Sequence, residues 1–207
     1  MLPLVQSMAL AYASGISVYA TILLVGLMER AHWIAPLPGV MGVASNTFVL
    51  IISGALATLE LGAQLIPGIA TVWEAVHTAI RPPAAALIAV ATAWHADPAI
   101  IAAAALLGGG IGLAAHATKL GVRAAVDTSP EPFSNGLLSA GELGIVAAIS
   151  YFVWHHPVIT LVIALLLLAA TILLLRSVWR LIRGQSARIA RSGSTFLAGR
   201  AGRTNER

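Results

Sequence analysis

Two glutamates stand inside long apolar stretches of the sequence, where an ionisable side chain is costly. Glu60 lies within residues 43–66 and Glu142 within residues 135–154, each about two helical turns from one end of its stretch. A carboxylate in such a place usually faces a partner or an aqueous cavity and marks a path for protons or ions. The alternative is a structural ion pair or a hydrogen bond between helices. We expect Glu60 and Glu142 to bind a proton or a cation.

A basic stripe stands at the end of another apolar stretch. His116, Lys119 and Arg123 are spaced to share one face of a helix. Small residues at every fourth position over residues 104–112 continue this face and let a second helix approach closely. We expect these three side chains to form a basic site at the cytoplasmic end of this helix. The site would hold an anion, a phosphate headgroup or the two glutamates. Snorkelling of the two cations toward the membrane interface is the alternative.

The remaining polar groups favour structural roles. Glu74 and His77 have the spacing of half a carboxylate-bridged metal site, but the motif occurs once, so we assign no metal and no cofactor. Asp127 and Glu131 fit helix caps better than catalytic groups. We find no nucleophile with a suitably spaced base, so the sequence does not predict an enzyme.

The elements that must position these groups are apolar stretches of membrane-spanning length. Hydrophobic residues make up 58% of the 207 residues and charged residues only 10%, whereas a soluble domain has roughly 25% charged residues. About 20 apolar residues cross a bilayer core as a helix. Composition therefore predicts an all-α, polytopic transmembrane helix bundle and excludes a soluble domain.

Six crossings are predicted, with turns or short loops between them. An amphipathic surface helix over residues 71–81 precedes the third crossing, which is short and begins at Pro82. The predicted crossings cover residues 3–28, 43–66, 82–94, 99–115, 135–154 and 158–175.

The charges are distributed very unevenly along the chain. Residues 176–207 hold eight arginines and one acid, a net charge of +7, whereas residues 1–175 hold four basic residues and seven acids, a net charge of −3. We predict a transmembrane domain over residues 1–183 and a basic, disordered cytoplasmic tail over residues 184–207. The tail would attract anionic lipid at about 1 kcal/mol per basic residue. Since the basic charge is confined to the tail, no nucleic-acid partner is expected.

Orientation follows from the same charges. With six crossings both ends of the chain lie on one side of the membrane, together with Arg81, Lys119, Arg123 and the tail, while Arg30 lies opposite. Basic residues concentrate on the cytoplasmic side of membrane proteins. The predicted topology is therefore N-in and C-in.

The two halves of the chain, residues 1–97 and 98–183, share an order of motifs. Each half contains two Gly-aliphatic pairs eleven residues apart, then a Pro-x-Pro loop, a Glu-Leu-Gly and a Trp. Three crossings in each half would give an inverted repeat, a design common in secondary transporters. Chance similarity in a chain rich in Gly, Ala and Leu is the alternative.

Three polar stretches, taken together, resemble a known family. They are residues 73–85, the run His116-Ala117-Thr118-Lys119, and the string Asp127-Thr128-Ser129-Pro130-Glu131-Pro132-Phe133-Ser134-Asn135. These stretches resemble a bacterial family of small integral membrane proteins, with plant relatives, that is catalogued as a domain of unknown function. The resemblance covers roughly residues 8–156 and implies a place in the bacterial cytoplasmic membrane, but it carries no activity.

The resemblance also adds residues to the list of candidate site residues. It implies that the polar loops carry the family's identity, which adds Arg81 and Glu131 to the candidates. The chain departs from the expected pattern in one place, because it has only Glu142, preceded by Gly141, where an acidic pair is expected.

These features favour a small transporter or channel. Glu60 and Glu142 would carry a proton or cation, the basic stripe would hold an anionic group, and the segment around Pro82 would move. Six short crossings enclose little volume and the glycine-rich face suits a self-contact, so we expect a homodimer in the lipid bilayer.

Two other functions stay open. The chain could be an accessory or lipid-binding membrane protein that does not transport, in which case the tail matters more than the glutamates. A lipid-modifying enzyme that uses His116 and Glu131 as acid and base ranks third.

Overall fold

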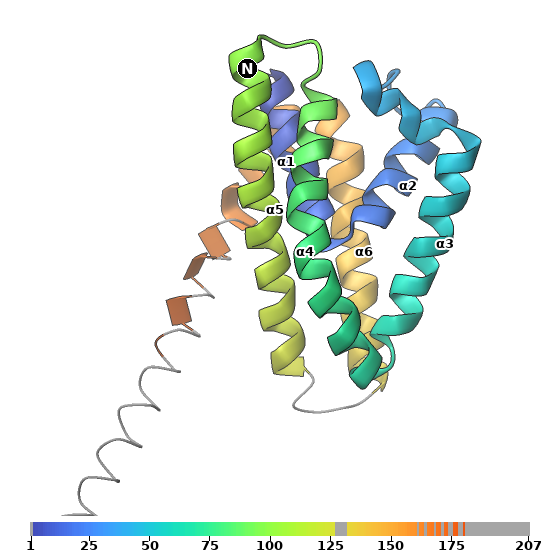
Figure 1. Cartoon of the computed structure of the whole chain (residues 1–207), viewed down its shortest axis with the longest axis vertical. Helices are drawn as coiled ribbons and strands as arrows, with labels where there is room; N and C mark the ends of the chain where they lie inside the picture. The colour runs from blue at the N-terminus through green and yellow to red at the C-terminus, as the bar shows by residue number, and fades with distance from the viewer. Residues whose placement is uncertain are drawn as a thin grey trace, which may run out of the picture. The chain divides into compact units, whose positions relative to one another are not determined.

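The fold is helical throughout the part of the chain that the structure describes. This computed structural model describes residues 2–126 and 132–160 and parts of 162–180 (Figure 1). Residues 1–171 form one unit and residues 172–207 a second, of which only a few helical residues are described. In chain order the elements are α1 (Leu2–Ile16), α2 (Val18–Arg30), the 3-10 helix η1 (Gly39–Ser45), α3 (Thr47–Gln64), α4 (Pro67–Thr92), α5 (Pro98–Val126) and α6 (Pro132–His155). The predicted all-α class is confirmed.

Three of the described helices are long and apolar enough to cross a bilayer. They cover residues 47–64, 98–124 and 133–155. Their large apolar side chains, such as Phe48 and Leu106, are exposed on the outside of the bundle. A helix that turns apolar residues outward and polar residues inward is suited to lipid. The chain is therefore a membrane protein.

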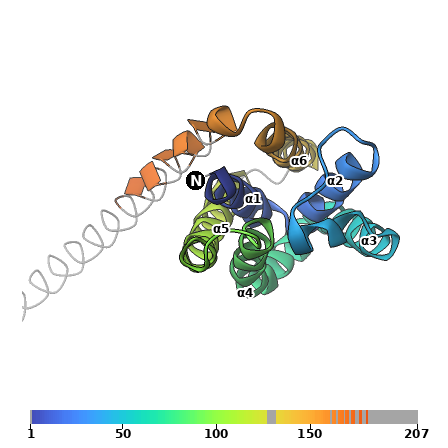
Figure 2. The same cartoon turned by 90° about the horizontal axis from the view of Figure 1, so that it is seen from above.

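Helix α1 is the centre of the bundle. It packs against α4, α5 and α6, and in the view along the bundle it lies among them (Figure 2). Every residue from 9 to 16 is buried. These residues include Ala9, Ala11, Ala13 and Gly15, whose small side chains let several helices come close at once.

The first apolar stretch does not make one crossing. Its helix breaks at Ser17, whose backbone is extended (φ −152°, ψ 111°) and whose side chain caps α2. Near the start of α1, Ser7 donates to the carbonyl of Ala89, late in α4. At the far end of α2, Arg30 donates to Thr47, the first residue of α3.

These contacts show that the chain reverses at Ser17. The late part of α4 and the start of α3 lie at the same end of the bundle, since Gly39 of η1 lies against Trp94. Both ends of the α1–α2 pair are therefore at that end, and the pair forms a helical hairpin (Figure 1) that turns at Ser17; we call this pair the re-entrant hairpin. Residues 3–28 are thus two helices and not the single spanning helix that was predicted, and the prediction of N-in and C-in, which counted this stretch as one crossing, is not supported.

Helix α4 is continuous where a break was predicted. The expected surface helix over residues 71–81 and the short crossing from Pro82 are one helix of 26 residues with Pro82 and Pro83 inside it. Proline removes a backbone donor and normally kinks a helix. Here Arg81 is completely buried in ion pairs, and the following residues pack on α5, which keeps the helix in place.

The small-residue face of α5 is covered within the chain. A Cβ on Gly112 would lie 2.3 Å from the Cβ of Ala85, and one on Gly108 would lie 2.5 Å from the Cβ of Ala89, both on α4. A Cβ on Gly15 of α1 would lie 2.4 Å from the carbonyl oxygen of Gly112. The predicted tight contact is confirmed, but its partners are α4 and α1, so this face does not support a homodimer.

The two halves of the predicted repeat differ in structure. The Gly15 and Gly26 pairs lie on either side of the break at Ser17, whereas the Gly110 and Gly121 pairs lie inside the continuous helix α5. The predicted tail over residues 184–207 lies outside the described residues, as do Asp127 and Glu131.

Candidate functional site

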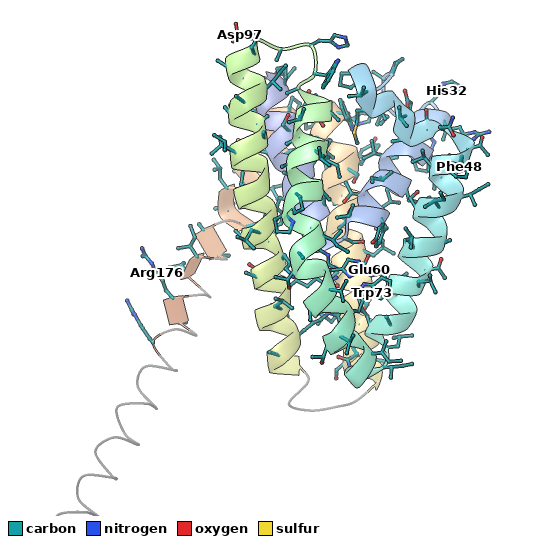
Figure 3. All side chains as sticks on the ribbon, viewed as in Figure 1. His32, Phe48, Glu60, Trp73, Asp97 and Arg176 are labelled. Carbon is teal, nitrogen blue, oxygen red and sulfur yellow. The ribbon has the colours of Figure 1, made fainter. Side chains whose placement is uncertain are left out.

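Seven ionisable side chains from four helices meet inside the bundle. Six are almost completely buried, and the Glu142 side chain is 13% exposed. Figure 3 labels Glu60 in the part of the bundle away from Asp97 and His32. We call this set the polar cluster; its members are Glu60 of α3, Glu74 and Arg81 of α4, His116, Lys119 and Arg123 of α5, and Glu142 of α6.

Arg81 joins the first two carboxylates. Its Nη2 lies 2.5 Å from Oε1 of Glu60, and its Nη1 lies 2.6 Å from Oε2 of Glu74. Gln64 donates to both carboxylates from one turn after Glu60. A buried arginine with two carboxylates keeps its charge compensated, which a membrane interior requires.

Lys119 connects all three carboxylates. Its Nζ lies 3.2 Å from Glu60, 3.2 Å from Glu74 and 3.1 Å from Glu142. It also donates to the carbonyl oxygen of Ile16 at 2.9 Å. An ammonium group has three donors, so these four contacts share them.

Arg123 and Glu142 form the least complete part of the cluster. Nη2 of Arg123 donates to Oε2 of Glu142 at 3.1 Å and to the hydroxyl of Ser139 at 3.1 Å. Among the described residues, Nε and Nη1 of Arg123 and Oε1 of Glu142 have no hydrogen-bond partner, although Nε lies 3.9 Å from Glu74. Buried polar groups are normally paired, so Arg123 and Glu142 are the members of the cluster whose hydrogen-bonding capacity is least satisfied among the described residues.

His116 is held as a neutral ring. Arg81 lies 2.8 Å from its Nδ1, and a guanidinium group can only donate, so Nδ1 accepts. The proton is then on Nε2, which lies 2.9 Å from the hydroxyl of Thr78. That hydroxyl in turn donates to the backbone carbonyl of Glu74.

The charges of the cluster balance. Glu60, Glu74 and Glu142 carry three negative charges, and Arg81, Lys119 and Arg123 carry three positive charges. With His116 neutral the net charge is zero. Each charge added to or removed from the cluster would therefore need a compensating charge.

The tip of the hairpin is part of this site. The last carbonyl of α1, on Ile16, accepts from Lys119, and Ser17 at the start of α2 donates to Glu60 at 2.5 Å. A cation thus stands at a helix C-terminus and an anion at a helix N-terminus, the arrangement that the helix dipoles favour. The polar cluster and the break in the backbone stabilise each other.

Cavities reach the cluster from different faces. One of about 620 Å³ is a groove between α1, α5 and α6, with Lys119 and Glu142 in its wall. A second, of about 140 Å³, lies between α4 and α5 and is lined by Glu74 and Arg123. A third, of about 20 Å³, is lined by Glu60, Lys119 and Glu142 among others. Lys119 and Glu142 therefore separate the groove from the small cavity.

The structure brings together six of the seven predicted site residues. Glu60, Glu142, Arg81 and the basic stripe all belong to the cluster. Glu131 lies outside the described residues.

Sequence reasoning missed Glu74 and Ser17. Glu74 was assigned to a surface helix, but it shares a helix face with Arg81, and in lipid such a polar face turns inward. Ser17 carried a weaker signal, since it is one of several small polar residues in this stretch, with Ser14 and Thr21 close by. Among the described residues no group of three His, Asp or Glu side chains could hold a metal ion.

A family model described as "Domain of unknown function (DUF4126)" matches residues 4–177. The chain belongs to this family. The resemblance expected from the polar stretches is confirmed, and the match to DUF4126 covers nearly all of the described helices, including the cluster. No curated protein and no solved structure matches the chain.

Proposed function

We propose that this protein is a small proton-coupled transporter and that the polar cluster is its coupling site. The observation that carries the proposal is a set of six charge-balanced side chains, five of them buried, at the tip of the re-entrant hairpin, with cavities on different faces lined by members of the set. Intramembrane charges around a discontinuous helix are typical of transporter sites.

Glu142 is the best candidate for the proton-binding group. It is the most exposed carboxylate of the cluster, and its Oε1 has no hydrogen-bond partner among the described residues. Protonation would weaken its contacts with Lys119 and Arg123 and leave the cluster with one excess positive charge. A solute anion could then balance that charge, so proton and solute would bind together.

The hairpin replaces the segment around Pro82 as the element proposed to move. Its tip is held by side chains of the cluster, through Ile16 and Ser17. A change of charge on these side chains would weaken or strengthen their contacts with the C-terminal end of α1 and the N-terminal end of α2. Movement of the hairpin would then open the cluster toward the end of the bundle from which α1 and α2 enter.

The proposed location is the cytoplasmic membrane, with the arginine-rich tail inside. The tail has a net charge of +7 over residues 176–207, and basic segments favour the cytoplasmic side. If residues 158–175 cross the membrane, the connections α3–α4 and α5–α6 face the cytoplasm and the ends of the hairpin face outward.

The alternative function is that of an accessory membrane protein whose cluster is only a structural clamp. The balanced charges of the cluster favour this alternative as well, because buried ion pairs also fix helix positions. Attachment to anionic lipid through the tail would then be the activity. Transport would require the polar cluster, whereas the accessory function would require the arginine-rich tail.

The proposal is tested with the purified protein in proteoliposomes that contain a trapped pH-sensitive dye. Small anions and cations are added outside one at a time, and the lumenal pH is followed. A transporter changes the lumenal pH with at least one ion, also after deletion of residues 185–207, but not with Glu142→Gln. An absence of ion-dependent change in folded protein, with the deletion alone affecting membrane attachment, would support the accessory function.

A further inference from the structure

The groove between α1, α5 and α6 has a distinct chemical character. Its volume of about 620 Å³ falls within the roughly 300–1,000 Å³ of small-molecule sites. Its walls are almost entirely apolar, with Tyr12, Val122, Leu138 and Ile145 among the lining residues. Lys119 and Glu142 are its charged groups. A molecule that fills it must therefore be apolar along its length and charged at one end.

The sign of that charge follows from the cluster. When Glu142 is protonated, Lys119 and Arg123 lose the negative charge of their shared partner, whose Oε2 lies 3.1 Å from each of them. Both cations are at least 95% buried, so they need a replacement anion. Arg123 lines the cavity between α4 and α5 and contacts the groove through Glu142, and its Nε and Nη1 lack a hydrogen-bond partner among the described residues. The group that fits is a compact anion with a single charge.

We propose that the groove binds a single-chain amphiphile with a singly charged anionic headgroup, which takes the place of Glu142 beside Lys119 and Arg123. The proposal rests on the proposed function and names its substrate class. A free amphiphile fits better than a bilayer phospholipid, because the charge must reach two nearly enclosed cations.

Binding should then take up one proton per anion. The groups that face Glu142 are Lys119 and Arg123 of α5, with Glu60 and Glu74 reached through them. On α1, Tyr12 lines the groove with Glu142 and the Ile16 carbonyl accepts from Lys119, while on α2 the Ser17 hydroxyl donates to Glu60. Protonation of Glu142 therefore changes the net charge of the cluster from zero to +1, and the anion returns it to zero.

The test is equilibrium binding of octanesulfonate to the full-length protein in phosphatidylcholine nanodiscs, measured by titration calorimetry. A sulfonate stays ionised at every pH used, so any pH dependence belongs to the protein. Wild type is expected to bind more tightly as the pH falls. Glu142→Gln, which mimics the protonated carboxyl, is expected to bind tightly with no pH dependence. Octyltrimethylammonium, with the opposite charge, is expected not to compete.

Two glycines of α6 provide a matched pair of variants. Gly141 lines the groove, and a Cβ there would meet nothing within 4 Å, so Gly141→Leu is the substitution that places added side-chain volume at the groove. Gly144 is equally open but does not line the groove. Gly141→Leu is expected to weaken binding by roughly tenfold or more, as loss of a well-fitted apolar contact does, and Gly144→Leu to leave it unchanged.

Several results would overturn the proposal. They are equal affinities for Gly141→Leu and Gly144→Leu, binding of the cationic amphiphile, or a pH dependence that persists in Glu142→Gln. Loss of octanesulfonate binding in phosphatidylglycerol nanodiscs would identify a bilayer lipid as the occupant instead. Proton flux without octanesulfonate binding would reject only this substrate class, whereas binding without any ion-coupled flux would reject transport.

Discussion

The ammonium group of Lys119 lies 2.9 Å from the carbonyl oxygen of Ile16, the last residue of α1. The same group contacts the carboxylates of Glu60, Glu74 and Glu142. One side chain therefore links the broken end of a buried helix to three charged partners. This link makes the position of the hairpin depend on the charge state of the cluster, which is the physical basis of the proposed coupling.

Lys119→Met should be strongly destabilising. It leaves three carboxylates against two cations and removes a donor from Ile16, and breaking a buried pair costs about 3–5 kcal/mol. Thermal unfolding in detergent would show this as a lowered midpoint. Arg30→Gln, which loses only an exposed hydrogen bond to Thr47, should change the midpoint little. Equal midpoints for the two variants would contradict the role given to Lys119.

Gly112→Ala should destabilise the bundle by about 1–3 kcal/mol, the usual cost of overpacking. The added Cβ would lie 2.3 Å from the Cβ of Ala85, so α4 and α5 would have to separate. Gly121→Ala on the same helix meets nothing within 4 Å and should be neutral or slightly stabilising, because Ala favours a helix over Gly. Chemical denaturation of both variants in the same detergent makes the comparison; a loss of stability in Gly121→Ala of the same size would count against the packing described.

The re-entrant hairpin gives a sharp prediction for membrane topology. The chain has no cysteine, so single cysteines can be introduced without further changes. Cysteines at positions 2, 32 and 97 should react with an impermeant thiol reagent from one side of the membrane, and one at position 66 from the other. If positions 2 and 32 reacted from opposite sides, residues 3–28 would make a crossing and the hairpin would be wrong.

Glu60 and Arg81 should be energetically coupled. Each single change, Glu60→Gln or Arg81→Gln, leaves one charge uncompensated, whereas the double change restores neutrality. The double variant should be more stable than the sum of the single effects by about 0.5–3 kcal/mol. A double-mutant cycle on unfolding free energies measures this coupling, and Glu60→Gln with Arg30→Gln serves as the control pair. Additive effects in the Glu60–Arg81 cycle would show that this ion pair contributes no net coupling.

The sequence was informative about the cluster because charges are rare in apolar stretches. Glu60, Glu142, Lys119 and Arg123 could be singled out one by one, since each must find a partner in the membrane. Their pairing could not be predicted, because Glu60 and Lys119 are 59 residues apart in the chain and meet only when α3 and α5 both pack against α4.

The backbone was harder to predict where tertiary contacts decide it. Ser17 is a good helix cap, but nothing in an apolar run indicates that the chain will turn there. The turn is stabilised by Lys119 and Glu60, which are distant in sequence. Conversely, Pro82 and Pro83 predicted a break, yet the burial of Arg81 and the packing on α5 keep α4 continuous.

The central claim is that Glu142 carries a proton through the cluster. The most direct test is the lumenal pH of proteoliposomes after an acid step outside, with a solute anion present, for wild type, Glu142→Gln and Asp97→Asn. Asp97 is an exposed carboxylate that caps α5 away from the cluster, so it controls for the loss of any carboxyl group. Wild type and Asp97→Asn should show anion-dependent acidification, and Glu142→Gln should show none. Equal acidification by wild type and Glu142→Gln, or none by any of the three folded proteins, would contradict it.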